Sequence, residues 1–263
     1  NGLDYKEKLI SSKEGIEINP IYTEENTKKI YPTNFPRDWI SFQEIDATNA
    51  KTANKKAVLS LNNNISGLSF KNPNNLNILL KDIQVNNISL RFTNYNSNFI
   101  NDWKSYCKDN NITIIAITDE NTIIPLGETA KEQINSGLNL AKNRKGDVFF
   151  QFEVGSDFFL EIAKLKAFRI LWKNTTNKDA FIFTQTSKKN KETEFEYNNL
   201  IRTTTECISS IFGGSNAILI HSFSKNTTEF SERIARNQQE ILRKESYLNK
   251  VKDPTKGSYY IEY

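Results

Sequence analysis

Residues 148–172 read VFFQFEV, GSD and then FFLEIAKLKAFRILW, which together make one strand-and-helix unit. The first seven residues are mostly apolar and of strand length, as is typical of a strand buried in a parallel sheet. The following Gly155, Ser156 and Asp157 form a helix-start signal. Positions 158, 162, 165, 169 and 172 then recur at four- and three-residue steps, which predicts a helix with one buried face.

The same alternation of strand and helix runs along most of the chain. Eight short runs rich in Ile, Val and Phe are predicted strands: residues 39–45, 67–70, 88–92, 112–118, 122–126, 148–154, 180–185 and 217–223. Helical patterns fill most gaps, with further strong ones at 197–212, which stops at a Gly-Gly pair, and at 228–251. Eight strands favour an α/β fold of the closed (β/α)₈ TIM-barrel type over an open doubly wound sheet.

One interval does not fit the alternation. Only Asp119, Glu120 and Asn121 separate the fourth predicted strand from the fifth. A crossover between parallel strands needs about a dozen residues or more. Either one barrel helix is missing here, or the two runs form one irregular element.

Residues 1–38 have no sustained period and are interrupted by Pro20, Pro32 and Pro36. We therefore predict an N-terminal arm over 1–38 and a barrel domain over 39–263. The apolar side chains of the arm must lie against other protein. We expect them on a partner chain, and the alternative is an arm that folds back over the N-terminal mouth of its own barrel.

Composition excludes several classes of function. The 35 Lys and Arg residues are mixed with 31 Asp and Glu residues, so the chain lacks the basic stripe of a nucleic-acid binder. We interpret the basic cluster at 188–191, which is followed by Glu192 and Glu194, as a solvated loop, with an anion site as the alternative. No apolar run is long enough for a membrane span or a signal peptide, which predicts a cytoplasmic protein. Methionine is absent, so we expect a piece of a longer product.

Metal-binding side chains are rare. The chain has two cysteines, Cys107 and Cys207, and one histidine, His221. This excludes a structural zinc site and catalysis by two histidines. Two reduced thiols are favoured over a disulfide.

Polar residues at the carboxyl ends of the predicted strands are the candidates for barrel chemistry. They are Asp46, Asn94, Asp119, Glu153, Gln185 and His221. The adjacent Asp119 and Glu120 favour a polar turn, and structural roles are favoured for Glu153 and His221. The sequence at 213–215, Gly-Gly-Ser, follows a helix and precedes a strand, which is the wrong order for a phosphate loop. The residues alone predict a barrel without an obvious active site.

Three segments resemble one known family, the cobalamin-dependent acyl-CoA mutases typified by methylmalonyl-CoA mutase. Residues 158–172 resemble the sixth barrel helix of that family. The sequence RIARN at 233–237, followed by Glu245 and Ser246, resembles its last barrel helix, and DPTKGSYYIE at 253–262 resembles the segment after it. Residues 185–187 and 202–205 are weaker anchors. The resemblance runs from about Phe35 to the end and implies a mutase barrel.

Several positions depart from the catalytic members of the family. Their first barrel strand carries Thr-Ile-Arg-Gln-Tyr, whose Arg and Tyr hold the acyl-CoA carboxylate and the reacting centre, whereas residues 40–44 here read ISFQE. A Gly-Tyr-His motif on the fifth strand has its nearest counterpart at 123–125, and a His-Ser-Gln-Thr-Ser stretch on the seventh becomes FTQTS at 183–187. The resemblance therefore implies degenerate cleft positions, with no catalytic, cofactor-binding or metal-binding residue. These positions are Phe42, Glu44, Pro125, Phe183 and Gln185.

The cobalamin side of the family pattern is also missing. The family presents cobalt with a histidine in an Asp-x-His-x-x-Gly loop, and the residues around His221 do not match it. The resemblance implies the small, non-catalytic subunit type of a heterodimeric methylmalonyl-CoA mutase. The cobalamin-binding domain is then absent from this chain, and adenosylcobalamin is expected on the large subunit, which interconverts (R)-methylmalonyl-CoA and succinyl-CoA in propionate metabolism. The alternatives are an active split mutase barrel that uses cobalamin from a separate chain, and an acyl-CoA-binding regulator.

A final expectation concerns the barrel interior. Phenylalanines are frequent on the predicted strands: Phe70, Phe92, Phe149, Phe150, Phe152 and Phe183. An eight-stranded barrel is just wide enough for side chains to fill. We therefore expect several of these rings to point inward and close the axial channel.

Overall fold

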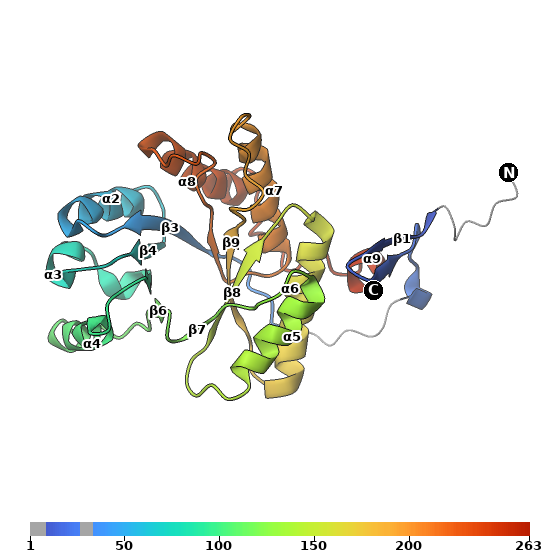
Figure 1. Cartoon of the computed structure of the whole chain (residues 1–263), viewed down its shortest axis with the longest axis horizontal. Helices are drawn as coiled ribbons and strands as arrows, with labels where there is room; N and C mark the ends of the chain where they lie inside the picture. The colour runs from blue at the N-terminus through green and yellow to red at the C-terminus, as the bar shows by residue number, and fades with distance from the viewer. Residues whose placement is uncertain (1–8, 27–33) are drawn as a thin grey trace, which may run out of the picture.

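Eight parallel strands wind in chain order around one axis in the computed structural model, which describes residues 9–26 and 34–263 (Figure 1). The strands are β3 (Ile40–Asp46), β4 (Gly67–Lys71), β5 (Ser89–Thr93), β6 (Ile117–Thr118), β7 (Thr122–Ile123), β8 (Phe149–Val154), β9 (Phe181–Thr186) and β10 (Ala217–Leu219). The first strand, β3, pairs with both β4 and the last strand, β10. The fold is therefore a nearly closed (β/α)₈ barrel, as predicted.

Helices cover the outside of the barrel. They are α2 (Ala50–Asn62), α3 (Leu76–Leu79), α4 (Phe99–Asp109), α5 (Ala130–Ala141), α6 (Phe158–Thr176), α7 (Asn198–Phe212) and α8 (Glu229–Lys244), with a 3-10 turn η2 (Val85–Asn87) after α3. In Figure 1, α2, α3 and α4 flank one half of the barrel, and α5 and α6 flank the other. The predicted helix over 228–251 was too long, because the chain leaves α8 after Lys244 and Tyr247 adopts a left-handed conformation with φ 54°.

The interval between β6 and β7 is a tight turn without a helix. The Asn121 side chain accepts the Thr118 N–H at 2.7 Å and donates to the Ala116 carbonyl at 2.9 Å, which holds residues 116–121 together. Within the described part of the chain, β6 and β7 are not paired with each other. One barrel helix is therefore missing, and the predicted strands over 112–118 and 122–126 are reduced to two residues each.

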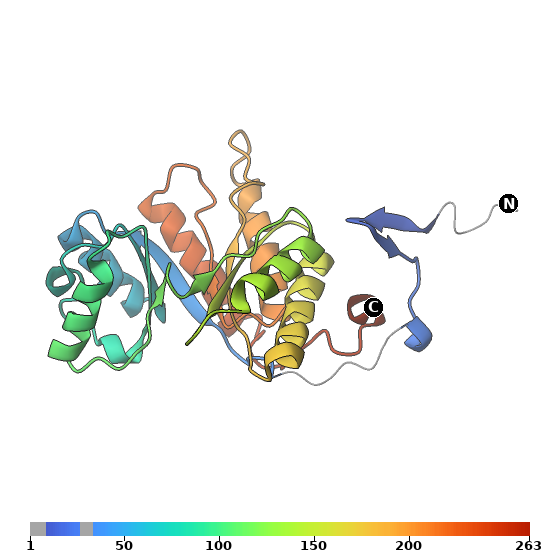
Figure 2. The same ribbon diagram turned by 60° about the horizontal axis from the view of Figure 1, so that its bottom comes forward.

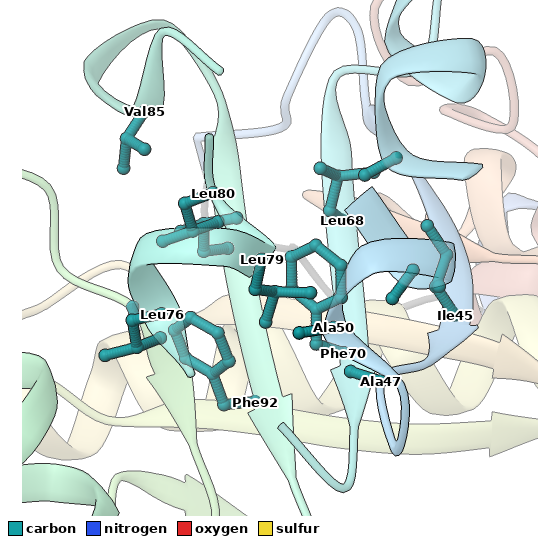
Figure 3. Packing of buried hydrophobic residues seen from close by; sticks show 14 of the residues in the cluster. Ile45, Ala47, Ala50, Leu68, Phe70, Leu76, Leu79, Leu80, Val85 and Phe92 are labelled. Atoms are coloured by element: carbon teal, nitrogen blue, oxygen red, sulfur yellow. The ribbon is translucent and has the colours of Figure 1, made fainter. Parts of the chain in front are cut away.

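The outward faces of the strands carry most of the core. Figure 3 shows Leu68, Phe70 and Phe92 packed with Ala50 of α2 and Leu79 of α3. A second cluster places Phe150 and Phe152 against Phe168 of α6, with ring centroids 4.7 and 4.9 Å apart. The expectation that the strand phenylalanines close the channel was therefore wrong for Phe70, Phe92, Phe150 and Phe152. Each of them lies on the alternate face of its strand, toward a helix.

The described part of the arm forms a short hairpin of β1 (Ser11–Lys13) and β2 (Ile16–Ile18), followed by η1 (Glu24–Asn26). We predicted no strand in this segment. The hairpin turn has positive φ at both Glu14 (51°) and Gly15 (76°), as tight β-hairpins require. Sequence reasoning missed it because only one of these two residues is a glycine.

The arm lies against its own chain. The Tyr22 ring is 5.5 Å from that of Tyr260 and 4.7 Å from that of Tyr263, at the C-terminal helix α9 (Tyr259–Glu262). Glu14 accepts the backbone N–H of Ala130, the first residue of α5, at 2.6 Å. Figure 2 shows the hairpin beside α9, outside the ring of barrel helices. Lys13 also pairs with Asp157 at the start of α6. The starts of these helices follow the carboxyl ends of the strands, so the contacts are not over the N-terminal mouth. Pro32 lies outside the described residues.

A buried lysine fastens the C-terminal segment to the barrel. Lys166 of α6 is 5% exposed and bonds Asp253 at 2.9 Å and the Thr255 hydroxyl at 3.0 Å. Two of the segments that carry the family resemblance, 158–172 and 253–262, therefore meet through this side chain. No helix among the described residues is long and apolar enough to cross a membrane.

Close packing inside the barrel makes Gly67 sensitive to substitution. A Cβ atom at Gly67 would lie 2.6 Å from the Phe42 ring, which cannot move without disturbing the interior. We expect Gly67→Ala to lower the free energy of unfolding by about 1–3 kcal/mol, measured by urea denaturation. Gly155→Ala is the matched control, because its Cβ would meet only Glu161 Oε1 at 3.6 Å.

The overpacking explanation has its own check. Adding Phe42→Leu to Gly67→Ala removes the colliding ring edge. The double variant should therefore lose less stability than the sum of the two single variants. Additive losses would contradict the collision.

Candidate functional site

Aromatic side chains fill the axis of the barrel. Phe42 of β3 and Phe183 of β9 meet edge to face with ring centroids 5.1 Å apart, and Phe149 and Phe181 do the same at 5.0 Å. They form a cluster to which only strand residues belong, including Ile117 and Leu219. A cluster built from strands on different sides of the barrel lies inside it. The expectation of inward-pointing rings is therefore confirmed for Phe149 and Phe183.

A buried arginine spans the interior beside these rings. Arg91 of β5 is 6% exposed, and it donates to the Ser69 hydroxyl at 2.9 Å and to Gln151 Oε1 at 2.5 Å. Its guanidinium carbon lies 5.0 Å from the centre of the Phe183 ring. Burial lowers the pKa of Arg91, and the more distant carboxylates Glu44 and Asp119 offset this only in part. The cation thus connects the second, third and sixth barrel strands across the axis.

Polar side chains join the carboxyl ends of the first four strands. Asp46 accepts the Thr48 N–H at 2.9 Å and the Asn72 amide at 3.3 Å. The Asn94 side chain donates to Asn72, and the Asn94 backbone N–H donates to Asp119 at 3.0 Å. Two of the predicted candidates, Asp46 and Asp119, are therefore linked through a pair of asparagines. All of these residues except Asn72 are exposed, and the contacts hold four loops in place.

The carboxyl ends of the remaining strands carry the other candidates. Glu153 accepts a short hydrogen bond from the Ser187 hydroxyl. The His221 backbone N–H donates to the Thr186 hydroxyl at 2.9 Å. Gln185 is partly exposed on β9, in register with Glu153 of β8. These three candidates lie near one another at the same end of the barrel.

His221 is the most buried of the candidates, at 7% exposed. Its Nδ1 atom is 4.0 Å from Glu44 Oε1, and Lys188 lies 3.6 Å from the same carboxylate oxygen. Burial, together with the nearby cations Lys188, Arg91 and Lys191, lowers the pKa of His221 well below its ordinary value of 6.5. The imidazole is therefore neutral near pH 7.

The loop between β9 and α7 is held by contacts with a buried glutamate of α7. Lys191 bonds both carboxylate oxygens of Glu206 at 2.9 Å, and Asn190 bonds the same group at 2.6 Å. Glu206 is fully buried, and burial raises its pKa while lowering that of Lys191. The interpretation of residues 188–191 as a solvated loop was therefore wrong for Lys191. Sequence reasoning could not find this ion pair, because the sequence does not reveal that Glu206 of α7 is buried.

The five degenerate positions do not all come together. Phe42 and Phe183 touch on the axis, and Glu44 and Gln185 follow them toward the rim. Pro125 instead packs outward, since a Cβ at Gly137 of α5 would lie 3.1 Å from its ring. Sequence reasoning also missed Arg91 and Asn72. Arg91 shares one face of β5 with Ser89 and Thr93, and alternation alone does not show that this polar face points inward.

Metal ligands do not gather in the described residues, where no group of three His, Cys, Asp or Glu side chains is close enough to hold an ion. Cys107 and Cys207 are both free, as predicted. Cys207 is fully buried and burial raises the pKa of its thiol, which keeps it protonated. The residues at the strand ends thus offer hydrogen bonds and charge, including the Ser187 hydroxyl bonded to the Glu153 carboxylate.

The neutral state of His221 has a measurable consequence. Below about pH 6.5 an unfolded histidine binds a proton, whereas the folded protein keeps this one neutral, so the unfolded state binds more protons. Stability must then fall as the pH drops below 6.5, by up to about 1.4 kcal/mol per pH unit until the folded-state pKa is reached. Urea denaturation of the protein and of His221→Asn over this range measures the difference. A midpoint near 6.5 for the single histidine signal in NMR would contradict it.

Comparison with known sequences places these features in a family. The sequence model of the family described as Methylmalonyl-CoA mutase matches residues 127–263. The methylmalonyl-CoA mutase small subunit of Porphyromonas gingivalis is 26% identical over 356 aligned positions, which cover 99% of this chain and 57% of that protein. The methylmalonyl-CoA mutases of Rhizobium meliloti and Homo sapiens are 37% and 34% identical over 51% of this chain, each match covering 20% of the relative.

The chain thus spans just over half of the small subunit and about a fifth of the other two relatives. A putative phosphonomutase of Burkholderia cenocepacia aligns in structure with a TM-score of only 0.25 at 8% identity, over 76% of this chain and 86% of that one. The family match covers more than half of the chain and coincides with α5, β8 to β10, α6 to α8 and the segment docked on Lys166. This chain belongs to the methylmalonyl-CoA mutase family.

Proposed function

We propose that this chain is the barrel of a small, non-catalytic subunit in a heterodimeric, adenosylcobalamin-dependent methylmalonyl-CoA mutase. Its partner would be the large subunit, which interconverts (R)-methylmalonyl-CoA and succinyl-CoA. The similarity to a small subunit over 99% of the chain supports this assignment. The activity then belongs to the complex, and this barrel supports it structurally.

The filled axis is the observation that carries the proposal. In the family that the chain resembles, the acyl-CoA substrate occupies the barrel. Here the Phe42 ring packs against Gly67 and contacts the Phe183 ring. Arg91 donates a hydrogen bond across the interior to Gln151. A substrate arm could enter only by displacing these well-packed side chains, which would cost several kcal/mol.

Charge at the rim argues in the same direction. Glu44 stands where the resemblance implies a group that helps bind the substrate. A carboxylate there repels a substrate carboxylate and donates no hydrogen bond to it. Glu44 is already engaged by Lys188 at 3.6 Å. The rim is therefore arranged for its own ion pair and not for a dicarboxylic acyl group.

The one histidine of this chain is not placed to ligate the cobalt of adenosylcobalamin. A cobalt ligand must present an imidazole nitrogen on an accessible loop. His221 is 7% exposed, follows directly from the barrel strand, and faces Glu44. We therefore assign no step of the isomerisation to this chain and place the cofactor on the partner.

Exposed apolar groups on the arm and at the C-terminus are consistent with a partner. Leu9 is 59% exposed, Ile21 75% and Tyr263 57%. Ile21 precedes Tyr22 in the sequence, and Tyr263 contacts the Tyr22 ring. A protein subunit that covered this surface would bury them. This is where we place the contact with the large subunit.

The test is a mutase assay on the purified heterodimer. Glu44→Gln and Gln185→Ala in this chain should leave kcat and KM unchanged within about twofold, since neither touches substrate. The positive control is substitution of the Arg or the Tyr in the Thr-Ile-Arg-Gln-Tyr strand of the large subunit. These substitutions should abolish turnover.

Two results would contradict the proposal. A fall in kcat of about a hundredfold with Glu44→Gln, in a complex of normal composition, would favour an active split mutase barrel. Saturable thermal stabilisation of the isolated chain by methylmalonyl-CoA would favour an acyl-CoA-binding regulator.

A further inference from the structure

A cavity of about 430 Å³ lies beside the barrel axis, at the carboxyl ends of β3 and β10. Its walls are the loop after β9, the loop after β10 and the first turns of α8. These are the loops that follow the seventh and eighth barrel strands. In this fold that location frequently binds phosphate groups.

One of the cations that line the cavity has no ion-pair partner among the described residues. Three lysines line it, namely Lys188, Lys191 and Lys225. Lys191 is held by Glu206 and Lys188 lies near Glu44. Lys225 has no ion-pair partner among residues 9–26 and 34–263. An exposed cation at the edge of a cavity is available to a ligand.

The other carboxylates that line the cavity are already neutralised. Glu232 pairs with Lys56 at 2.8 Å, and Glu192 pairs with Arg202 at 2.5 Å. Each of these cations reaches the carboxylate from an element outside the cavity lining. The buried Arg91 adds a further positive charge without a carboxylate partner in the described chain. The cavity is therefore electrostatically positive despite its glutamates.

The imidazole of His221 is a second, independent indication of a ligand. It lines the cavity at 7% exposed, and its ring nitrogens have no hydrogen bond to any described residue. The nearest acceptor, Glu44, is 4.0 Å away. A ligand oxygen in the cavity would supply the missing partner.

We propose that this cavity binds the phosphate group of a small phosphate monoester. Lys225 supplies the unpaired charge, and Lys188 adds to it from its ion pair with Glu44. His221 donates one ring N–H, and Thr193 and Thr227 lie in the same lining. A dianionic phosphate has enough acceptors for all of these donors, whereas a monocarboxylate has fewer. Helix α8 begins just beyond Thr228, so its positive end adds to the field.

The volume limits the size of the ligand. A cavity of about 430 Å³ is at the small end of the range for organic ligands. It accommodates a phosphate with a short carbon chain and excludes a whole coenzyme A molecule. The site lies off the filled axis and needs no open channel, so it is independent of the proposed role as a mutase subunit.

The sole histidine makes a direct binding experiment possible. Because His221 is the only histidine, the ¹H–¹³C NMR spectrum of the full-length chain contains a single histidine Cε1 signal. We expect glycerol 3-phosphate, used as the probe at constant ionic strength, to shift this signal saturably with a Kd of about 1 mM or lower. Inorganic phosphate should shift it in the same direction, which assigns the effect to the phosphate group.

Matched variants locate the effect. Lys188→Ala combined with Lys225→Ala should weaken binding of the probe at least tenfold. Lys142→Ala combined with Lys178→Ala is the control, because it removes the same charge at residues that line a different cavity. This control should leave the Kd unchanged within about twofold.

Three outcomes would overturn the proposal. One is an absence of saturable shift up to about 20 mM probe. Another is equal weakening by the two double variants, which would indicate a response to overall charge. The third is an equal shift by sodium acetate at the same concentration, which would show that the site does not select phosphate. None of these experiments measures mutase activity, so a negative result here would leave the proposed function unaffected.

Discussion

The pairing of the first barrel strand with the last holds the rest of the structure in place. The strands β3 and β10 pair in parallel, with Leu219 opposite Phe42. Helix α8 secures this junction, because Gln239 accepts from the Trp39 indole at 3.2 Å and Arg243 donates to the Trp39 carbonyl at 2.5 Å. On the opposite side of the barrel, β6 and β7 lack such pairing within the described chain. Closure at β3–β10 is what brings Glu44 next to His221.

The side chains that fill the barrel axis determine where a ligand can bind. Once Phe42, Phe183 and Arg91 occupy the axis, the space left at the carboxyl end lies off the axis, under the loops after β9 and β10. The loop after β9 is held in place by Lys191 and Asn190, which both bond the buried Glu206. The barrel therefore combines a structural core with a preformed polar cavity beside it.

The family likeness and the irregular part of the barrel fall in different halves. The family match begins at residue 127, after the helix-free turn between β6 and β7. The matched half contains Arg169, which is 2% exposed and bonds Ala180, Gly214 and Asn216. This buried cation ties residue 180 to the segment at 214–216. In the first half, Arg91 bonds Ser69 and Gln151 in a similar way, but the two-residue strand β6 carries little pairing.

The sequence by itself determined the barrel class, the alternation of β8 into two faces and the helix that begins at Phe158, because hydrophobic alternation and helix caps are local properties. It also carried the family resemblance. Only the tertiary structure decided which phenylalanines fill the axis, since inward and outward faces of a strand look alike when both are buried. It alone brought Lys191 to Glu206 and His221 to Glu44. Those pairs join separate elements of the barrel, and their distances depend on how the barrel closes rather than on any local pattern.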